Sequence, residues 1–151
     1  MAEAGFAQAL YNLGFMYANG QGVAQDYAAA VNWYRKAADQ GNAGAQFNLG
    51  LMYDNGQGVA QDYAAAVNWY RRAADQGPAQ AQFNLGLMYA KGQGVAQDYV
   101  QAHKWFNLSA ASGNASAVKN RDIIASKMTP AQIAEAQRLA SAWRPTKPKA
   151  P

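Results

Sequence analysis

Residues 43–53 carry apolar side chains at the spacing of one helical face. Ala45, Leu49 and Met52 stand at positions i, i+4 and i+7, and residues so spaced lie on one side of an α-helix. Gly50 falls in the middle of this pattern, where glycine destabilises a helix by about 1 kcal/mol relative to alanine. The segment therefore predicts an amphipathic helix, and its glycine predicts that a second helix crosses closely there.

A second apolar stripe follows in residues 63–75. Ala66, Trp69 and Ala73 lie on one side of the expected helix, and polar residues such as Arg72 lie opposite. The large Trp69 side chain, flanked by alanines, predicts a wedge between this helix pair and a neighbour. The chain is thus expected to be built from pairs of amphipathic helices, with no strands.

The loop between the two helices, residues 55–62, is rich in glycine. Gly56 and Gly58 permit positive φ angles and a tight reversal, and Asp62 is placed to cap the next helix by accepting its free N–H groups. A glycine-rich loop can also bind phosphate. No strand precedes this one, however, and no Lys-Ser/Thr pair follows it, so the sequence favours a structural role.

The whole pattern recurs about every 36 residues, which indicates a stacked array of helix pairs. The recurrence keeps these residues in register: Gly14, Gly50 and Gly86; Trp33, Trp69 and Trp105; Asp26, Asp62 and Asp98. The first two copies agree at about 29 of 36 positions. We expect one domain over residues 1–143, with repeats at about 5–40, 41–76 and 77–112, and a partial fourth unit with a cap at 113–143.

Both ends of the chain depart from the repeat. Residues 2–4 align with residues 38–40, the end of a helix in the next copy, so we expect Met1 to be a start added at a cut. Upstream of it would stand either a longer array or an export signal. These alternatives stay open.

The fourth copy begins at Asn114 and then loses its pattern, because Arg121 stands where an apolar leucine is expected. The segment from Thr129 then reads as a helix start, with threonine as the cap, proline first and glutamine third. We expect this last helix to cover the open end of the array. Residues 144–151, which are basic and rich in proline, are expected to be a disordered tail.

Charge and composition narrow the possible chemistry. The formal charge is +4, but three of the thirteen basic residues lie in the last eight, so the body is nearly neutral and nucleic-acid binding is not expected. Cysteine is absent, and the single His103 fits a packing position better than a ligand position. No apolar run is long enough to span a bilayer, so no membrane insertion is expected.

The repeated pattern A-x-x-x-L-G-x-M-Y-x-x-G-x-G-V-x-x-D-Y-x-x-A-x-x-W-x-x-x-A-A-x-x-G closely resembles the Sel1-like repeat over roughly residues 5–112. The resemblance implies an all-α fold, an α/α superhelical solenoid related to tetratricopeptide arrays, and an adaptor or scaffold role. Many bacterial members of this family are exported. A cysteine-rich branch has been linked to penicillin binding and weak β-lactamase activity, but this chain has neither cysteine nor an S-x-x-K motif.

We therefore expect a non-enzymatic protein-interaction module that binds a peptide or partner protein on its concave face. The alternatives are a structural spacer within a longer repeat protein and, for an enzyme, the activity of the cysteine-rich branch. We expect a monomer that needs no cofactor and no metal. The compartment stays open, with export from a bacterium as one alternative.

The candidate binding face is the side of each first helix that the core does not claim. It consists of Tyr11, Phe15 and Asn19 in the first copy, Phe47, Leu51, Asp54 and Asn55 in the second, and Phe83, Leu87 and Lys91 in the third. In one interpretation these aromatic residues pack against the neighbouring repeat. In the other, part of the stripe lines a groove and binds an extended or helical peptide, since exposed apolar patches mark interaction sites.

Overall fold

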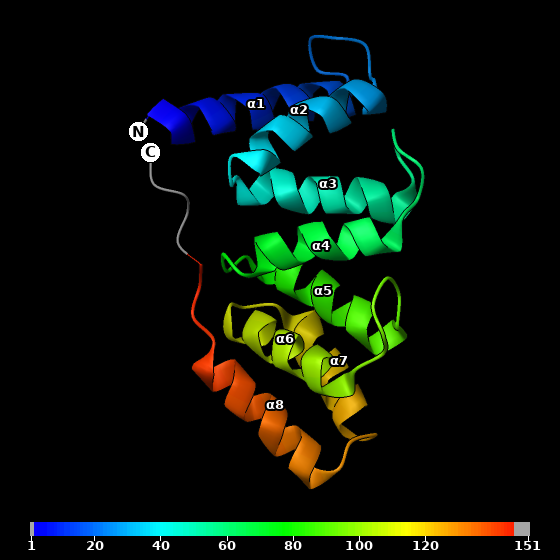
Figure 1. The fold of residues 1–151 in the computed structure, drawn as a ribbon, viewed down its shortest axis with the longest axis vertical. Helices are drawn as coiled ribbons and strands as arrows, with labels where there is room; N and C mark the ends of the chain where they lie inside the picture. Colours follow the sequence, from blue (N-terminus) through cyan, green and yellow to red (C-terminus); the bar gives the residue numbers. More distant parts are fainter. Residues whose placement is uncertain (1, 147–151) are drawn as a thin grey trace. The chain divides into compact units, whose positions relative to one another are not determined.

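A computed structural model describes residues 2–146, and within them all regular structure is helical. The helices divide into two compact units, residues 2–73 and 74–146, each of which is described by itself. Each unit consists of consecutive helices joined by short loops (Figure 1). The all-α repeat solenoid expected from the sequence is confirmed.

The first unit contains four helices: α1 (Ala2–Asn19), α2 (Tyr27–Asp39), α3 (Ala43–Asn55) and α4 (Tyr63–Ala74), the last of which runs one residue past the unit. The predicted face of α3 is buried, since Ala45 and Leu49 are fully covered and Met52 nearly so. These residues pack with Val31 and Tyr34 of α2 in one core. The apolar spacing in the sequence therefore identified the packed side of the helix.

Close approach of a second helix explains the glycine in the middle of α3. A Cβ atom on Gly50 would lie 2.7 Å from Cδ1 and Cε1 of Tyr70 on α4, too close for any real side chain. Gly14 faces the ring of Tyr34 in the same way. Each glycine is thus a notch that receives an aromatic ring from the second helix of its own repeat.

The ring of α4 that enters the notch at Gly50 is Tyr70, while Trp69, the predicted wedge towards a neighbouring repeat, packs against a core that includes residues of the first repeat. Tyr70 is fully buried, and its hydroxyl donates a hydrogen bond of 2.8 Å to Oδ2 of Asp54. Trp69 is half-buried, with the guanidinium of Arg72 4.7 Å from the centre of its ring. The two residues are neighbours on the helix, and the notch at Gly50 decides which of them goes inside.

The glycine-rich loop before α4 has the structural role expected of it. Gly56 ends α3 in the left-handed conformation with φ of 67°, and Asp62 accepts a hydrogen bond of 3.1 Å from the backbone N–H of Ala65. Gly58 has φ of 73°, and a Cβ atom there would lie 2.5 Å from the backbone carbonyl of Tyr27. The loop therefore lies directly on the start of α2.

The first helix is longer than its equivalents and lacks the side-chain cap of the second repeat. In the second repeat, Gly41 precedes Asn42, whose side chain accepts a hydrogen bond from the N–H of Ala45 and starts α3. The first repeat has Gly5 and Phe6 at these positions. Phenylalanine cannot accept this bond, and α1 begins at Ala2 instead of near residue 7. The third repeat has Pro78 at this position, and its first helix begins in register without a side-chain cap.

The second unit contains α5 (Ala79–Lys91), α6 (Tyr99–Ala111), α7 (Ala115–Ala125) and α8 (Pro130–Ala142). The residues at which the fourth repeat loses its pattern still form a helix, α7, which packs on α6 through Ala117 and Ile124. Thr129 caps α8 in a complete capping box with Gln132, as the sequence predicted. Ala136 and Ala140 are its buried residues, and Trp143 lies edge-on to Trp105 with 6.3 Å between ring centres.

The first residues of the predicted tail are described, and they contact the second unit. The backbone N–H of Thr146 donates a hydrogen bond of 2.6 Å to the carbonyl of Asp75. Arg144 donates to the carbonyls of Ser141 and Trp143. The rest of the predicted disordered tail, residues 147–151, lies outside the described residues.

Candidate functional site

Three of the candidate residues contribute to packing within their own repeats. Tyr11, Phe47 and Phe83 are half-buried, and each ring meets the aromatic ring of the second helix. The ring centres are separated by 5.7 Å for Tyr11 and Tyr34, 5.9 Å for Phe47 and Tyr70, and 5.7 Å for Phe83 and Phe106. Such offset pairs stabilise a fold, so much of the apolar surface of these rings is already used inside the repeat.

The next position along each first helix is more exposed. Phe15 has 42% of its surface exposed, and Leu51 and Leu87 are half-buried. Stepping forward once more by the repeat length leads to Ile123 on α7, which is 48% exposed. Sequence reasoning missed Ile123, although the 36-residue register would have identified it.

The polar edge of the predicted face is exposed except at one residue. Asn19, Asn55 and Lys91 all reach solvent, and Asn19 Nδ2 donates a hydrogen bond of 2.9 Å to the carbonyl of Phe15. Asp54 is half-buried, and its carboxylate accepts a hydrogen bond from the Tyr70 hydroxyl. Asp54 therefore has a structural partner within its own repeat.

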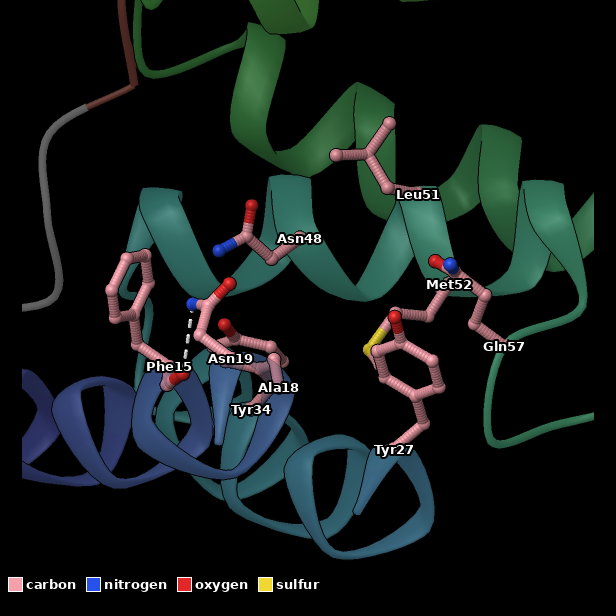
Figure 2. A pocket seen from close by; sticks show the side chains of 9 residues that line it. All are labelled: Phe15, Ala18, Asn19, Tyr27, Tyr34, Asn48, Leu51, Met52 and Gln57. Carbon is pink, nitrogen blue, oxygen red and sulfur yellow. Dashed lines mark hydrogen bonds between the residues drawn. The ribbon is translucent and has the colours of Figure 1, made fainter. Parts of the chain in front are cut away.

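A cavity of about 270 Å³ lies between α1, α2 and α3 (Figure 2). Its lining consists of Phe15, Ala18, Asn19, Tyr27, Tyr34, Asn48, Leu51, Met52 and Gln57. In Figure 2, Ala18, Asn19 and Tyr34 gather on one side below Asn48, and Tyr27 stands with Met52 and Gln57 on the other. Leu51 lies at the rim, and its side chain points away from the rest.

The cavity brings three candidate residues together with six that sequence reasoning did not select. Phe15, Asn19 and Leu51 were candidates. Asn48 belongs to a column of asparagines that recurs in every copy as Asn12, Asn48, Asn84 and Asn120, and this recurrence is a signal that could have identified it. Tyr27 and Gln57 come from a helix start and a loop, so only the folded chain brings them together.

No residue that lines the cavity carries a formal charge, and its polar groups are phenols and carboxamides. Burial raises the pKa of Tyr34 to about 12, against a smaller opposite effect of a hydrogen bond from the Asn48 side chain and a further small increase from Tyr11. The Tyr34 hydroxyl therefore stays protonated at physiological pH. The cavity presents neutral donors and acceptors on an apolar floor.

A second cavity of about 590 Å³ lies at the other side of α1, lined by Phe6, Leu10, Leu13, Trp33, Lys36, Asp39 and Gln40. Phe6 is 58% exposed, and the ammonium of Lys36 lies 4.7 Å from the centre of the Trp33 ring. It contains none of the predicted candidate residues.

The acidic residues of the repeats are occupied by capping. Asp26, Asp62 and Asp98 each accept a hydrogen bond of 3.1 Å from a backbone N–H three residues further on. Within residues 2–146 no three His, Asp or Glu side chains gather in a way that could hold a metal ion. In the same part of the chain, no helix has both the length and the apolar character that crossing a bilayer requires.

His103 is buried, with 4% of its surface exposed, which agrees with a packing position. Its Nδ1 atom is buried and has no hydrogen-bond partner. Burial lowers the pKa of His103, the charge of Arg121 lowers it further, and Asp122 partly opposes both. The imidazole is therefore kept neutral inside the second unit.

Comparison with known proteins agrees with this architecture. A family model described as the Sel1 repeat matches residues 7–42, 43–78 and 79–114. A crystal structure of a Sel1 repeat protein from Oxalobacter formigenes is 38% identical, with a TM-score of 0.76, and the match covers 78% of this chain and 48% of that one. No curated protein matches the sequence.

A second solved structure extends the similarity over more of the chain. It is a protective antigen present in uropathogenic Escherichia coli strains, described as displaying an SLR fold. Its sequence is 42% identical, its TM-score is 0.79, and the match covers 93% of this chain and 31% of that one. The chain thus spans less than half the length of either similar protein, and proteins built from such repeats are generally interaction scaffolds, typically without catalytic activity.

Proposed function

The chain belongs to the Sel1 repeat family, and from that premise we propose that it is a non-enzymatic module that binds a peptide or partner protein on the uncovered face of its first helices. The observation that carries the proposal is the cavity between α1, α2 and α3. It lies where the predicted face leaves Phe15 and Asn19 exposed.

The size of the cavity favours part of a peptide over a whole small molecule. Pockets for drug-sized ligands and cofactors have volumes of roughly 300–1,000 Å³. This cavity, at about 270 Å³, falls below that range and has room for one or two side chains. A partner would therefore insert an anchoring side chain and lie across the helices on either side.

The chemistry of the lining fits a polypeptide. A carboxamide offers both donors and an acceptor, so Asn19 and Asn48 can bond the N–H and C=O groups of an extended chain. Phe15 and Met52 provide apolar contact, and methionine adapts to different shapes. Because the lining is uncharged, affinity should depend on shape and hydrogen bonding more than on salt.

The equivalent residues of the second unit, Phe83, Leu87 and Lys91, are proposed to contribute to binding in the same way. Leu87 is half-buried and Lys91 is exposed, so both can reach a partner. Lys91 occupies the register of Asn19 and Asn55 and adds a positive charge at the edge. Such variation at the edge is expected if edge residues select the partner while the glycines maintain the fold.

The proposal is tested with a displayed library of random dodecapeptides, which offers many different sequences to the cavity at once. The wild-type protein is expected to enrich a defined set of peptides. Phe15→Gln combined with Leu51→Gln should reduce the affinity of those peptides at least tenfold. The free energy of unfolding should stay within about 1 kcal/mol of wild type, because both side chains are partly exposed.

The matched control is Phe6→Gln. Phe6 is an exposed phenylalanine on the same helix and outside the cavity, so this variant should bind as the wild type does. Loss of binding in the control alone would move the site to the second cavity. If no peptide is enriched, the interaction-module proposal fails and the structural spacer gains support.

A further inference from the structure

The three repeats carry three versions of one contact between their helices. The aromatic ring that enters the glycine notch is Tyr34 in the first repeat, Tyr70 in the second and Phe106 in the third. The residue that stands four places after the notch, on the first helix of each pair, is Ala18, Asp54 and Ala90 respectively. The first repeat thus combines the tyrosine of the second with the alanine of the third.

In the second and third repeats, no tyrosine hydroxyl at this position lacks a carboxylate acceptor. In the second, the Tyr70 hydroxyl donates to the Asp54 carboxylate at 2.8 Å. In the third, Phe106 has no hydroxyl and Ala90 has no carboxylate, so nothing polar needs a partner. A buried hydroxyl is unfavourable without an acceptor, and in these two repeats the hydroxyl and the carboxylate are either both present or both absent.

The first repeat keeps the hydroxyl and lacks the carboxylate. Tyr34 is 3% exposed. A hydrogen bond with the Asn48 side chain lowers the pKa of Tyr34 against the effect of burial, as expected if Asn48 donates to the phenol oxygen. The repeat itself supplies no carboxylate for the Tyr34 proton, because Ala18 takes the place of the aspartate. Ala18 and Tyr34 both line the cavity.

The surrounding frame is the same in the first two repeats. A Cβ atom on Gly14 would lie 2.6 Å from the ring of Tyr34, and one on Gly50 would lie 2.7 Å from the ring of Tyr70. The ring pairs that flank the position also match, with interplanar angles of 44° and 37°. The position of the Asp54 carboxylate relative to Tyr70 therefore indicates where a carboxylate would lie relative to Tyr34.

We propose that the cavity between α1, α2 and α3 binds a carboxylate of an acidic peptide, and that this carboxylate accepts a hydrogen bond from the Tyr34 hydroxyl, as the Asp54 carboxylate does from Tyr70 in the next repeat. The inference rests on the proposed function and names the anchor that the partner supplies. Asn19 and Asn48 lie on the same side of the cavity (Figure 2). Each carboxamide has two N–H groups, and the hydrogen bonds of Asn19 to the Phe15 carbonyl and of Asn48 to the Tyr11 hydroxyl each use one of them. No acidic side chain lines the cavity to repel the anion.

The test compares matched peptides on wild type and on two variants that copy the protein's own repeats. A peptide enriched from the dodecapeptide library is synthesised with its acidic residue as Glu and as Gln. Wild type should bind the Glu form at least tenfold more tightly, the effect of one hydrogen bond to a charged group. Tyr34→Phe, which reproduces the third repeat, should remove this preference.

Ala18→Asp, which reproduces the second repeat, places a carboxylate next to Tyr34 and should reduce binding of the Glu form at least tenfold while the protein stays folded by circular dichroism. The same substitution at Ala90, where Phe106 offers no hydroxyl, is the control and should leave the preference unchanged. Equal affinity for the Glu and Gln peptides would overturn the inference while the interaction module stands. A preference that survives in Tyr34→Phe would also overturn it, and failure of every peptide to bind would overturn both proposals.

Discussion

Substituting Gly50 by alanine sets two known effects against each other, and the structure decides between them. Alanine is favoured over glycine in a helix interior by about 1 kcal/mol. The new Cβ atom, however, would lie 2.7 Å from two atoms of the Tyr70 ring and 3.4 Å from the carbonyl of Ala66. The ring would have to move by about 0.7 Å to restore ordinary contact, which begins near 3.4 Å.

That movement is expensive because Tyr70 is held at both ends. The ring is fully buried, and its hydroxyl donates to Asp54, so a shift strains the packing and lengthens the hydrogen bond. Overpacking of a core costs about 1–3 kcal/mol, and a weakened bond to a charged group adds up to about 1.5 kcal/mol. After the helical gain of about 1 kcal/mol, we expect Gly50→Ala to destabilise the protein by up to about 3.5 kcal/mol.

Urea unfolding followed by circular dichroism measures this difference. Gly5→Ala is the control, because Gly5 also lies in a helix, α1, and a Cβ atom there meets nothing within 4 Å. It should be neutral or stabilise by up to about 1 kcal/mol. A stabilised Gly50→Ala variant would show that the ring has room to move, and the notch explanation would be wrong.

Three further expectations concern the second unit. The lowered pKa of His103 means that the unfolded state binds a proton at higher pH than the folded state, so the free energy of unfolding should fall as pH decreases below 6.5. His103→Val introduces the residue that the second repeat has at Val67, and it should reduce this pH dependence when urea unfolding is compared at about pH 7 and about pH 5. Deleting residues 129–143 should uncover apolar surface and cause association in ultracentrifugation, whereas an equally stable monomer would contradict the capping role of α8. Thr129→Ala should cost about 1 kcal/mol through loss of its cap, and a thermal midpoint equal to wild type would contradict it.

The sequence was sufficient for several features that depend on local spacing. The recurrence of glycine and tryptophan identified the repeats, and helical spacing identified the buried face of Ala45, Leu49 and Met52. The capping of α8 was also predictable, since the threonine, proline and glutamine at its start act within one turn. In each case, the residues that decide the structure lie within a few positions of each other.

Features that depend on a partner helix were not predictable in the same way. Trp69 and Tyr70 are adjacent along the chain, and only the position of Gly50 across the helix pair selects Tyr70 as the buried ring. The cavity is a similar case. Tyr27 and Gln57 are far apart in sequence, and they come together because the loop around Gly58 lies on the backbone of α2.

Near-identity between copies also separates structural polar groups from those available to a partner. Gln46 donates to the carbonyl of Ala38 at 3.1 Å, and Gln82 donates to that of Ala74 at 3.3 Å, so this position has the same structural partner in both repeats that carry it. The tyrosine in the notch differs, because its acceptor is present beside Tyr70 and replaced by alanine beside Tyr34. Tyr34 thus has a cavity beside it where Tyr70 has a carboxylate from its own repeat, and this difference between two nearly identical copies is what supports the proposed binding of an external carboxylate at Tyr34.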